Sequence, residues 1–120
     1  MTKRADPSVL PRAAAAAVER ALKVMPVVVV LGARQTGKTT LVHTLPALAG
    51  RPYFSLDDFD LRTQADEDPE ALVARAPLPI LDEVQRSSDL LIAVKRAVDL
   101  DGQRTPGMFV LTGSANLLMM

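Results

Sequence analysis

The stretch LGARQTGKTT, from Leu31 to Thr40, places two glycines five positions apart and follows the second with a lysine and two threonines. This is the G-x-x-x-x-G-K-[ST] or Walker A pattern, in which a loop between a strand and a helix wraps its backbone N–H groups around a polyphosphate. The apolar run PVVVVL before it is typical of a buried strand, and LVHTL after it continues as a helix. The stretch therefore predicts an α/β fold with a nucleotide-binding loop.

Each part of this loop has an expected chemical role. Lys38 would reach the β- and γ-phosphate oxygens, and the helix that begins near it would point its N–H groups at the phosphates. Thr39 would give its hydroxyl to Mg²⁺, which prefers hard oxygen ligands. The complete predicted binding set is Gly32, Ala33, Arg34, Gln35, Thr36, Gly37, Lys38, Thr39 and Thr40.

The composition limits the class of protein. A chain of 120 residues with 48% hydrophobic content is enough for one globular domain. The sequence has no cysteine, which excludes disulfides and thiolate zinc sites and suits a reducing compartment. The apolar runs Ala13–Val18 and Val27–Leu31 are far too short to span a bilayer. We therefore expect a soluble, cytoplasmic protein with no membrane partner.

The charge is balanced overall but unevenly distributed. Residues 1–51 carry eight Lys/Arg and two Asp/Glu, and residues 52–120 carry six and twelve, so the two parts have net charges of +6 and −6. A basic part could favour nucleic acid, but Arg34 and Lys38 belong to the phosphate loop and the other cations are scattered. With only 3% aromatic residues for base stacking, the sequence disfavours a nucleic-acid partner.

Hydrophobic patterning predicts strands that alternate with helices, which favours a parallel sheet with right-handed crossovers. The expected strands are Val27–Leu31, Pro52–Leu56, Leu78–Asp82 and Met108–Thr112. An N-terminal extension and helix fill residues 1–26, with Val18, Leu22 and Met25 facing the core. The expected helices are Arg12–Val24 and Lys38–Leu48, with the last turn of the second disturbed by Pro46. Short helical pieces lie on either side of a break at Asp66–Pro69, and the second of them is Glu70–Ala76. A further helix, capped by Ser87 or Ser88, runs to about Leu100, with Leu90, Leu91, Val94 and Val98 on its buried face.

A second motif, ILDE at residues 80–83, is an apolar strand whose carboxyl end delivers two adjacent carboxylates. Ligands of open α/β sheets bind at those ends. Asp82 could hold Mg²⁺ through bound water, and Glu83 could orient and deprotonate a water for attack on the γ-phosphate. A strand that ends in solvated acids is the alternative. Asp57 and Asp58, after the second strand, fit either the metal environment or a helix N-cap.

The third motif is FVLTGSAN, in which the fourth strand leads to small polar side chains. Thr112, Ser114 and Asn116 could contact the γ-phosphate or the attacking water, or could form a simple polar turn. His43 has no second ligand nearby in sequence, and we expect it on a helix surface.

Taken in order, GARQTGKTTL, YFSLDD, ILDEVQR and VLTGSAN resemble the bacterial and archaeal AAA-type ATPases that pair an N-terminal P-loop domain with a C-terminal module of unknown function. The resemblance implies a three-layer α/β/α P-loop NTPase fold with strand order 1-4-3-2 for the strands present. It implies Asp82 and Glu83 as the Walker B acids and Ser114 or Thr112 as the sensor. It further implies hydrolysis of ATP with Mg²⁺, with Lys38, Glu83 and Ser114 as catalytic residues and with Thr39 and Asp82 as metal residues.

The family's fifth strand, arginine finger, helical lid and C-terminal module have no counterpart within these 120 residues. Neither Arg86 nor Arg104 matches the finger, so we expect a C-terminally truncated single domain with slow turnover. Without a fifth strand, Val27–Leu31 would be a sheet edge that self-associates or recruits a covering partner. Two alternatives stay open: a P-loop kinase, which does not need Glu83, and a nucleotide-binding interaction module without turnover. No N-K-x-D segment for guanine recognition occurs.

Overall fold

The computed structural model describes residues 12–31 and 45–113 of the chain. Its four strands run parallel in the order β1-β4-β3-β2, which confirms the predicted α/β fold and strand order. The strands are β1 (Val27–Leu31), β2 (Tyr53–Ser55), β3 (Ile80–Asp82) and β4 (Phe109–Gly113). The helices are α1 (Arg12–Leu22), α3 (Phe59–Glu67), α4 (Pro69–Val73) and α5 (Ser88–Leu100), and the 3₁₀ turns are η1 (Pro46–Leu48) and η2 (Val84–Arg86).

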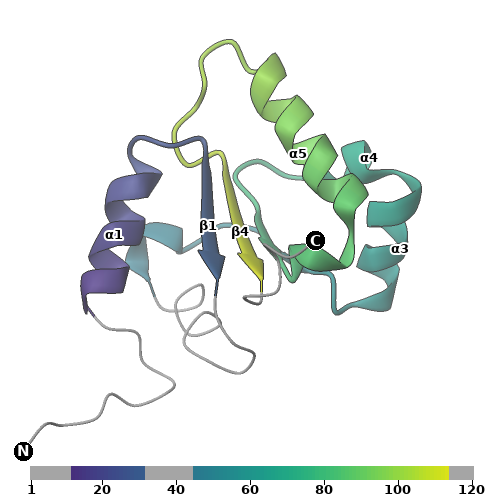
Figure 1. The fold of residues 1–120 in the computed structure, drawn as a ribbon, viewed down its shortest axis with the longest axis horizontal. Coiled ribbons are helices and arrows are strands. Elements are labelled where there is room, and N and C mark those ends of the chain that lie inside the picture. Colours follow the sequence, from purple (N-terminus) through teal and green to yellow (C-terminus); the bar gives the residue numbers. More distant parts are fainter. Residues whose placement is uncertain (1–11, 32–44, 114–120) are drawn as a thin grey trace, which may run out of the picture.

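The sheet lies between two helical layers. Helix α1 covers one face, and α3, α4 and α5 cover the other (Figure 1). Because successive side chains of a strand point to opposite faces, Ile80 and Val110 pack toward α1, while Leu81 and Leu111 pack toward α5. The described residues thus form three layers, as predicted.

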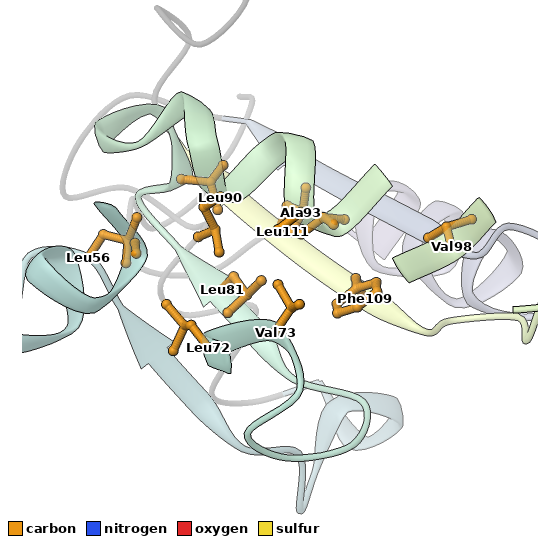
Figure 2. Packing of buried hydrophobic residues seen from close by; sticks show 12 residues of the cluster. Leu56, Leu72, Val73, Leu81, Leu90, Ala93, Val98, Phe109 and Leu111 are labelled. Carbon is orange, nitrogen blue, oxygen red and sulfur yellow. The ribbon is translucent and has the colours of Figure 1, made fainter. Parts of the chain in front are cut away.

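The larger hydrophobic core fills the space between the sheet and α4 and α5. Figure 2 shows Leu81, Phe109 and Leu111 of the sheet meeting side chains of both helices. Helix α5 contributes Leu90, Val94 and Val98, which are four residues apart and therefore lie on one helix face. This is the face that the sequence predicts, and it fixes the strands whose carboxyl ends carry the polar residues described below.

Side-chain caps set where the helices begin. The Asp58 carboxylate accepts hydrogen bonds from the backbone N–H groups of Asp60 at 2.8 Å and Leu61 at 3.2 Å, which caps α3. Asp68 ends α3 and caps α4, so the expected helix break is confirmed. Ser87 Oγ accepts from Leu90 N at 3.2 Å and caps α5. No helix within the described ranges is both long and apolar enough to cross a membrane.

Several predicted boundaries were wrong for identifiable reasons. The α-helix expected to reach Leu48 does not include Leu45, whose backbone is extended, and residues 46–48 form a 3₁₀ turn. Pro46 has no N–H to continue an α-helix. Leu78 has a left-handed φ of 53°, so β3 begins at Ile80. Helix α1 ends at Leu22, and this leaves Met25 off the helical stripe and 51% exposed. The piece expected at 70–76 spans Pro69–Val73 instead.

Candidate active site

Polar side chains gather at the carboxyl ends of β2, β3 and β4. Asp82 is the last residue of β3, and its register partner Ser55 is the last residue of β2. On the other side of β3, Thr112 lies one residue before the end of β4. Strands that run parallel bring these ends to one edge of the sheet, which is where ligands of open α/β folds bind.

The Asp82 carboxylate is buried and is held by three hydroxyl groups. Tyr53 Oη donates to Asp82 Oδ2 at 2.7 Å, and Ser55 Oγ donates to the same oxygen at 3.1 Å. Thr112 Oγ1 donates to Asp82 Oδ1 from β4. Asp82 is only 7% exposed, and a buried carboxylate is tolerated only when it is hydrogen-bonded. Both flanking strands therefore fix the position of this acid.

The phenol of Tyr53 is suited to its role as a donor. Burial raises the pKa of Tyr53 well above its ordinary value of 10.0, and the hydrogen bond to Asp82 raises it further. The phenol therefore keeps its proton at neutral pH and continues to donate to Asp82.

Glu83 follows directly after the strand and has an unusual backbone. Its φ of 58° and ψ of 45° lie in the left-handed region, which non-glycine residues seldom adopt. The chain must turn here because Leu81 and Val84 are both fully buried in the larger core. The Glu83 side chain is buried as well, and its Oε1 accepts a hydrogen bond from Gln85 Nε2 at 2.7 Å. Backbone strain of this kind is found often at functional sites.

A third acid, Asp57, completes a group that could hold a metal ion. Carboxylate oxygens of Asp57, Asp82 and Glu83 all lie within 4.8 Å of one another. Arg86 Nε forms an ion pair with Asp57 Oδ1 at 2.9 Å on the exposed side of this group. Mg²⁺ binds through one or two carboxylates and retains water, so this donor set fits it. Of the two acids that follow β2, Asp57 therefore lies at the site, whereas Asp58 is a helix cap.

The structure brings together some of the predicted site residues and does not describe others. Asp82, Glu83 and Thr112 meet at one edge of the sheet. The predicted loop Gly32–Thr40, with Lys38 and Thr39, lies outside the described residues, as do His43, Ser114 and Asn116. Their roles stay predictions. Within the described part of the chain, the Thr112 hydroxyl donates a hydrogen bond to Asp82.

Sequence reasoning missed three residues of this site: Tyr53, Ser55 and Gln85. Tyr53 and Ser55 are two positions apart on one strand, so their side chains share a face of the sheet. That spacing was available in the sequence, but the pairing with Asp82 depends on the register of β2 against β3. Nothing in the sequence marked Gln85 as a site residue except its position two residues after Glu83.

Comparisons with known proteins give one family and two curated relatives. The model of a family described as "AAA domain" matches residues 24–120. Two curated relatives, uncharacterized proteins of Mycobacterium bovis and Mycobacterium tuberculosis, are each 35% identical to the chain over 105 residues. The matched segment is 88% of this chain but only 23% of each relative, so the chain spans about a quarter of their length. No solved structure gives a significant match.

Proposed function

The chain belongs to the AAA domain family, and we propose that it binds ATP with Mg²⁺ and hydrolyses the ATP to ADP and inorganic phosphate. The observation that carries the proposal is the pair of buried acids, Asp82 and Glu83, at the carboxyl end of β3. The predicted phosphate loop follows β1 directly, and β1 ends at the same edge of this parallel sheet. A loop that begins at this edge would meet the same ligand as the two acids.

The residues of the chain divide into those that bind and those that act on water. Lys38 and the backbone N–H groups of residues 32–40 hold the phosphates in this proposal. Asp82, fixed by its three hydroxyl donors, and Thr39 would hold the cation, and Asp57 lies near Asp82. Bound Mg²⁺ would neutralise the charge that develops on the transferring phosphoryl group.

Glu83 acts on the attacking water. Its carboxylate accepts one proton while the water oxygen bonds to the γ-phosphorus. The bond between that phosphorus and the β,γ-bridging oxygen breaks, and ADP leaves with the electron pair. The proton on Glu83 is then released to solvent. A P-loop kinase would transfer the same group to a bound acceptor and would have no use for a water-activating acid beside Asp82.

We also propose a cytoplasmic location. A sequence without cysteine suits a reducing compartment, and the cytoplasm supplies ATP.

Single-turnover phosphate release, with the protein in excess over Mg·ATP and no acceptor present, tests the proposal. Glu83→Gln should lower the release rate by about 10²- to 10⁴-fold, the usual contribution of a general base. The ATP affinity of Glu83→Gln should stay within about threefold of the wild-type value, because the proton transfer that is lost occurs only in the transition state. Glu67→Gln, at the exposed end of α3, is the matched control and should behave as wild type. Equal release by wild type and Glu83→Gln would remove Glu83 from the reaction.

A further inference from the structure

The side-chain amide of Gln85 has one satisfied end and one unsatisfied end. Nε2 donates to Glu83 Oε1 at 2.7 Å. The carbonyl oxygen Oε1 of the same amide is buried and has no hydrogen-bond partner among the described residues. The reverse orientation of the amide would place its carbonyl oxygen against the Glu83 carboxylate, and the two oxygens would repel each other. Nε2 is therefore the atom that faces Glu83. A buried acceptor of this kind is normally satisfied by water or by a ligand.

The two acceptors are close enough for one water molecule to join them. Standard bond lengths of the amide, together with its hydrogen bond to Glu83, place Gln85 Oε1 within about 5 Å of Glu83 Oε1. A water that donates two hydrogen bonds of about 2.8 Å joins acceptors between 4 and 5 Å apart. Such a water directs its lone pairs away from both acceptors, and this is the orientation that an attacking water needs.

The turn that carries Gln85 is anchored on both sides. Val84 is fully buried in the larger core. Arg86 N donates to Glu83 O at 3.1 Å, and the Arg86 side chain pairs with Asp57. Gln85 is therefore held in place before any ligand binds, as an effective catalytic group should be.

We propose that Gln85 Oε1 is the second acceptor for the attacking water. This rests on the proposed function and adds a catalytic residue to it. One hydrogen of the water is bonded to Glu83, which takes it as a proton. The other hydrogen is hydrogen-bonded to Gln85 Oε1. It stays on the water oxygen while that oxygen bonds to the γ-phosphorus. The bond to the bridging oxygen breaks, and the electron pair leaves with ADP.

Binding of a transition-state mimic tests this inference without requiring turnover. Fluoroaluminate bound beside Mg·ADP takes the place of the transferring phosphoryl group, with the attacking water opposite the ADP. Calorimetry should show that fluoroaluminate tightens Mg·ADP binding to wild type by at least about tenfold, as expected of transition-state analogues. Gln85→Met, which keeps the length of the side chain, should lose most of this gain while Mg·ADP affinity stays within twofold. Gln103→Met, at an exposed glutamine, is the control.

Phosphate release gives the second readout. Gln85→Met should slow release by about 10- to 100-fold, and Gln85→Leu, which also removes the amide acceptor, should do the same. Because both residues hold one water, the double variant Glu83→Gln/Gln85→Met should be hardly slower than Glu83→Gln alone. If Gln85→Met proves unstable, Gln85→Leu decides.

The outcomes separate the inference from the proposed function. A wild-type protein that does not bind Mg·ATP contradicts the proposed function. A wild type that binds Mg·ATP but gains nothing from fluoroaluminate contradicts the proposed hydrolysis, and the role of Gln85 with it. A Gln85→Met variant with an undiminished gain, or a double variant in which the two losses multiply, overturns the role of Gln85 alone.

Discussion

Thr112 on β4 donates its hydroxyl hydrogen bond to Oδ1 of Asp82 on the neighbouring strand β3. From the opposite side, Tyr53 and Ser55 of β2 donate to Oδ2. Donors on both flanking strands therefore place the Asp82 carboxylate, and they do so where the candidate metal ligands gather. The position of the acid is thus set by the pairing of β2, β3 and β4 rather than by a loop.

Removing the Thr112 hydroxyl should destabilise the fold. Thr112→Val keeps the shape of the side chain but leaves the buried Asp82 with one donor fewer, which should lower the free energy of unfolding by about 1–3 kcal/mol. Urea denaturation measures this difference. Thr63→Val, at a partly buried position of α3, should change stability by less than about 0.5 kcal/mol. A Thr112→Val protein as stable as wild type would show that this hydrogen bond does not hold Asp82.

Asp82 and Asp57 should contribute unequally to Mg²⁺-dependent binding. Asp82→Asn should weaken the Mg²⁺-dependent part of ATP binding by about 10- to 100-fold, the usual effect of disturbing a metal site. Asp57→Asn should have a smaller effect, because Asp57 is exposed and shares Oδ1 with Arg86. Titration of ATP at several Mg²⁺ concentrations compares the two variants. The metal assignment fails if Asp57→Asn is the more damaging substitution.

Gly107 is required by the packing of α1 against the loop before β4. It has a φ of 66°, and a Cβ would lie 3.0 Å from the backbone oxygen of Leu22 and 3.0 Å from Arg51 Nη2. The arginine can move but the carbonyl cannot, so Gly107→Ala should cost about 1–3 kcal/mol of stability. Gly102→Ala is the control, because a Cβ there meets nothing within 4 Å. Equal melting temperatures for the two variants would refute this account of Gly107.

The outer edge of β1 should mediate self-association of the chain. Within the described residues β1 pairs only with β4, and Val29 is 47% exposed. A flat apolar edge offers unpaired backbone groups to another strand. We expect the 120-residue chain to self-associate through this edge, and Val29→Lys to reduce the association. Light scattering over a concentration series decides, and a wild type that stays monomeric at the highest concentration contradicts the prediction.

Sequence patterns predicted the helices and strands whose formation depends mainly on neighbouring residues. The run Val27–Leu31 is β1 to the residue, because a continuous β-branched segment has few alternatives in a parallel sheet. Ser87 and the apolar positions of α5 were likewise predictable from capping and periodicity. The strand order came from the resemblance to known ATPases, since spacing alone does not order parallel strands.

Long-range contacts could not be predicted from these patterns. Tyr53, Ser55 and Thr112 lie 29, 27 and 30 residues from Asp82 in sequence, and they meet it only because of strand register. The left-handed backbone of Glu83 was also unexpected, because it results from burial of the residues on either side rather than from its own preference.

The central claim is that residues 32–40 bind the phosphates of Mg·ATP, and calorimetric titration of the Lys38→Ala variant tests it most directly. Charge-assisted contacts to phosphate are the strong ones, so the variant should lose most of its affinity for Mg·ATP. Lys95→Ala, at an exposed lysine of α5 paired with Asp99, should bind as wild type does. A folded Lys38→Ala protein that binds Mg·ATP with unchanged affinity would contradict the account.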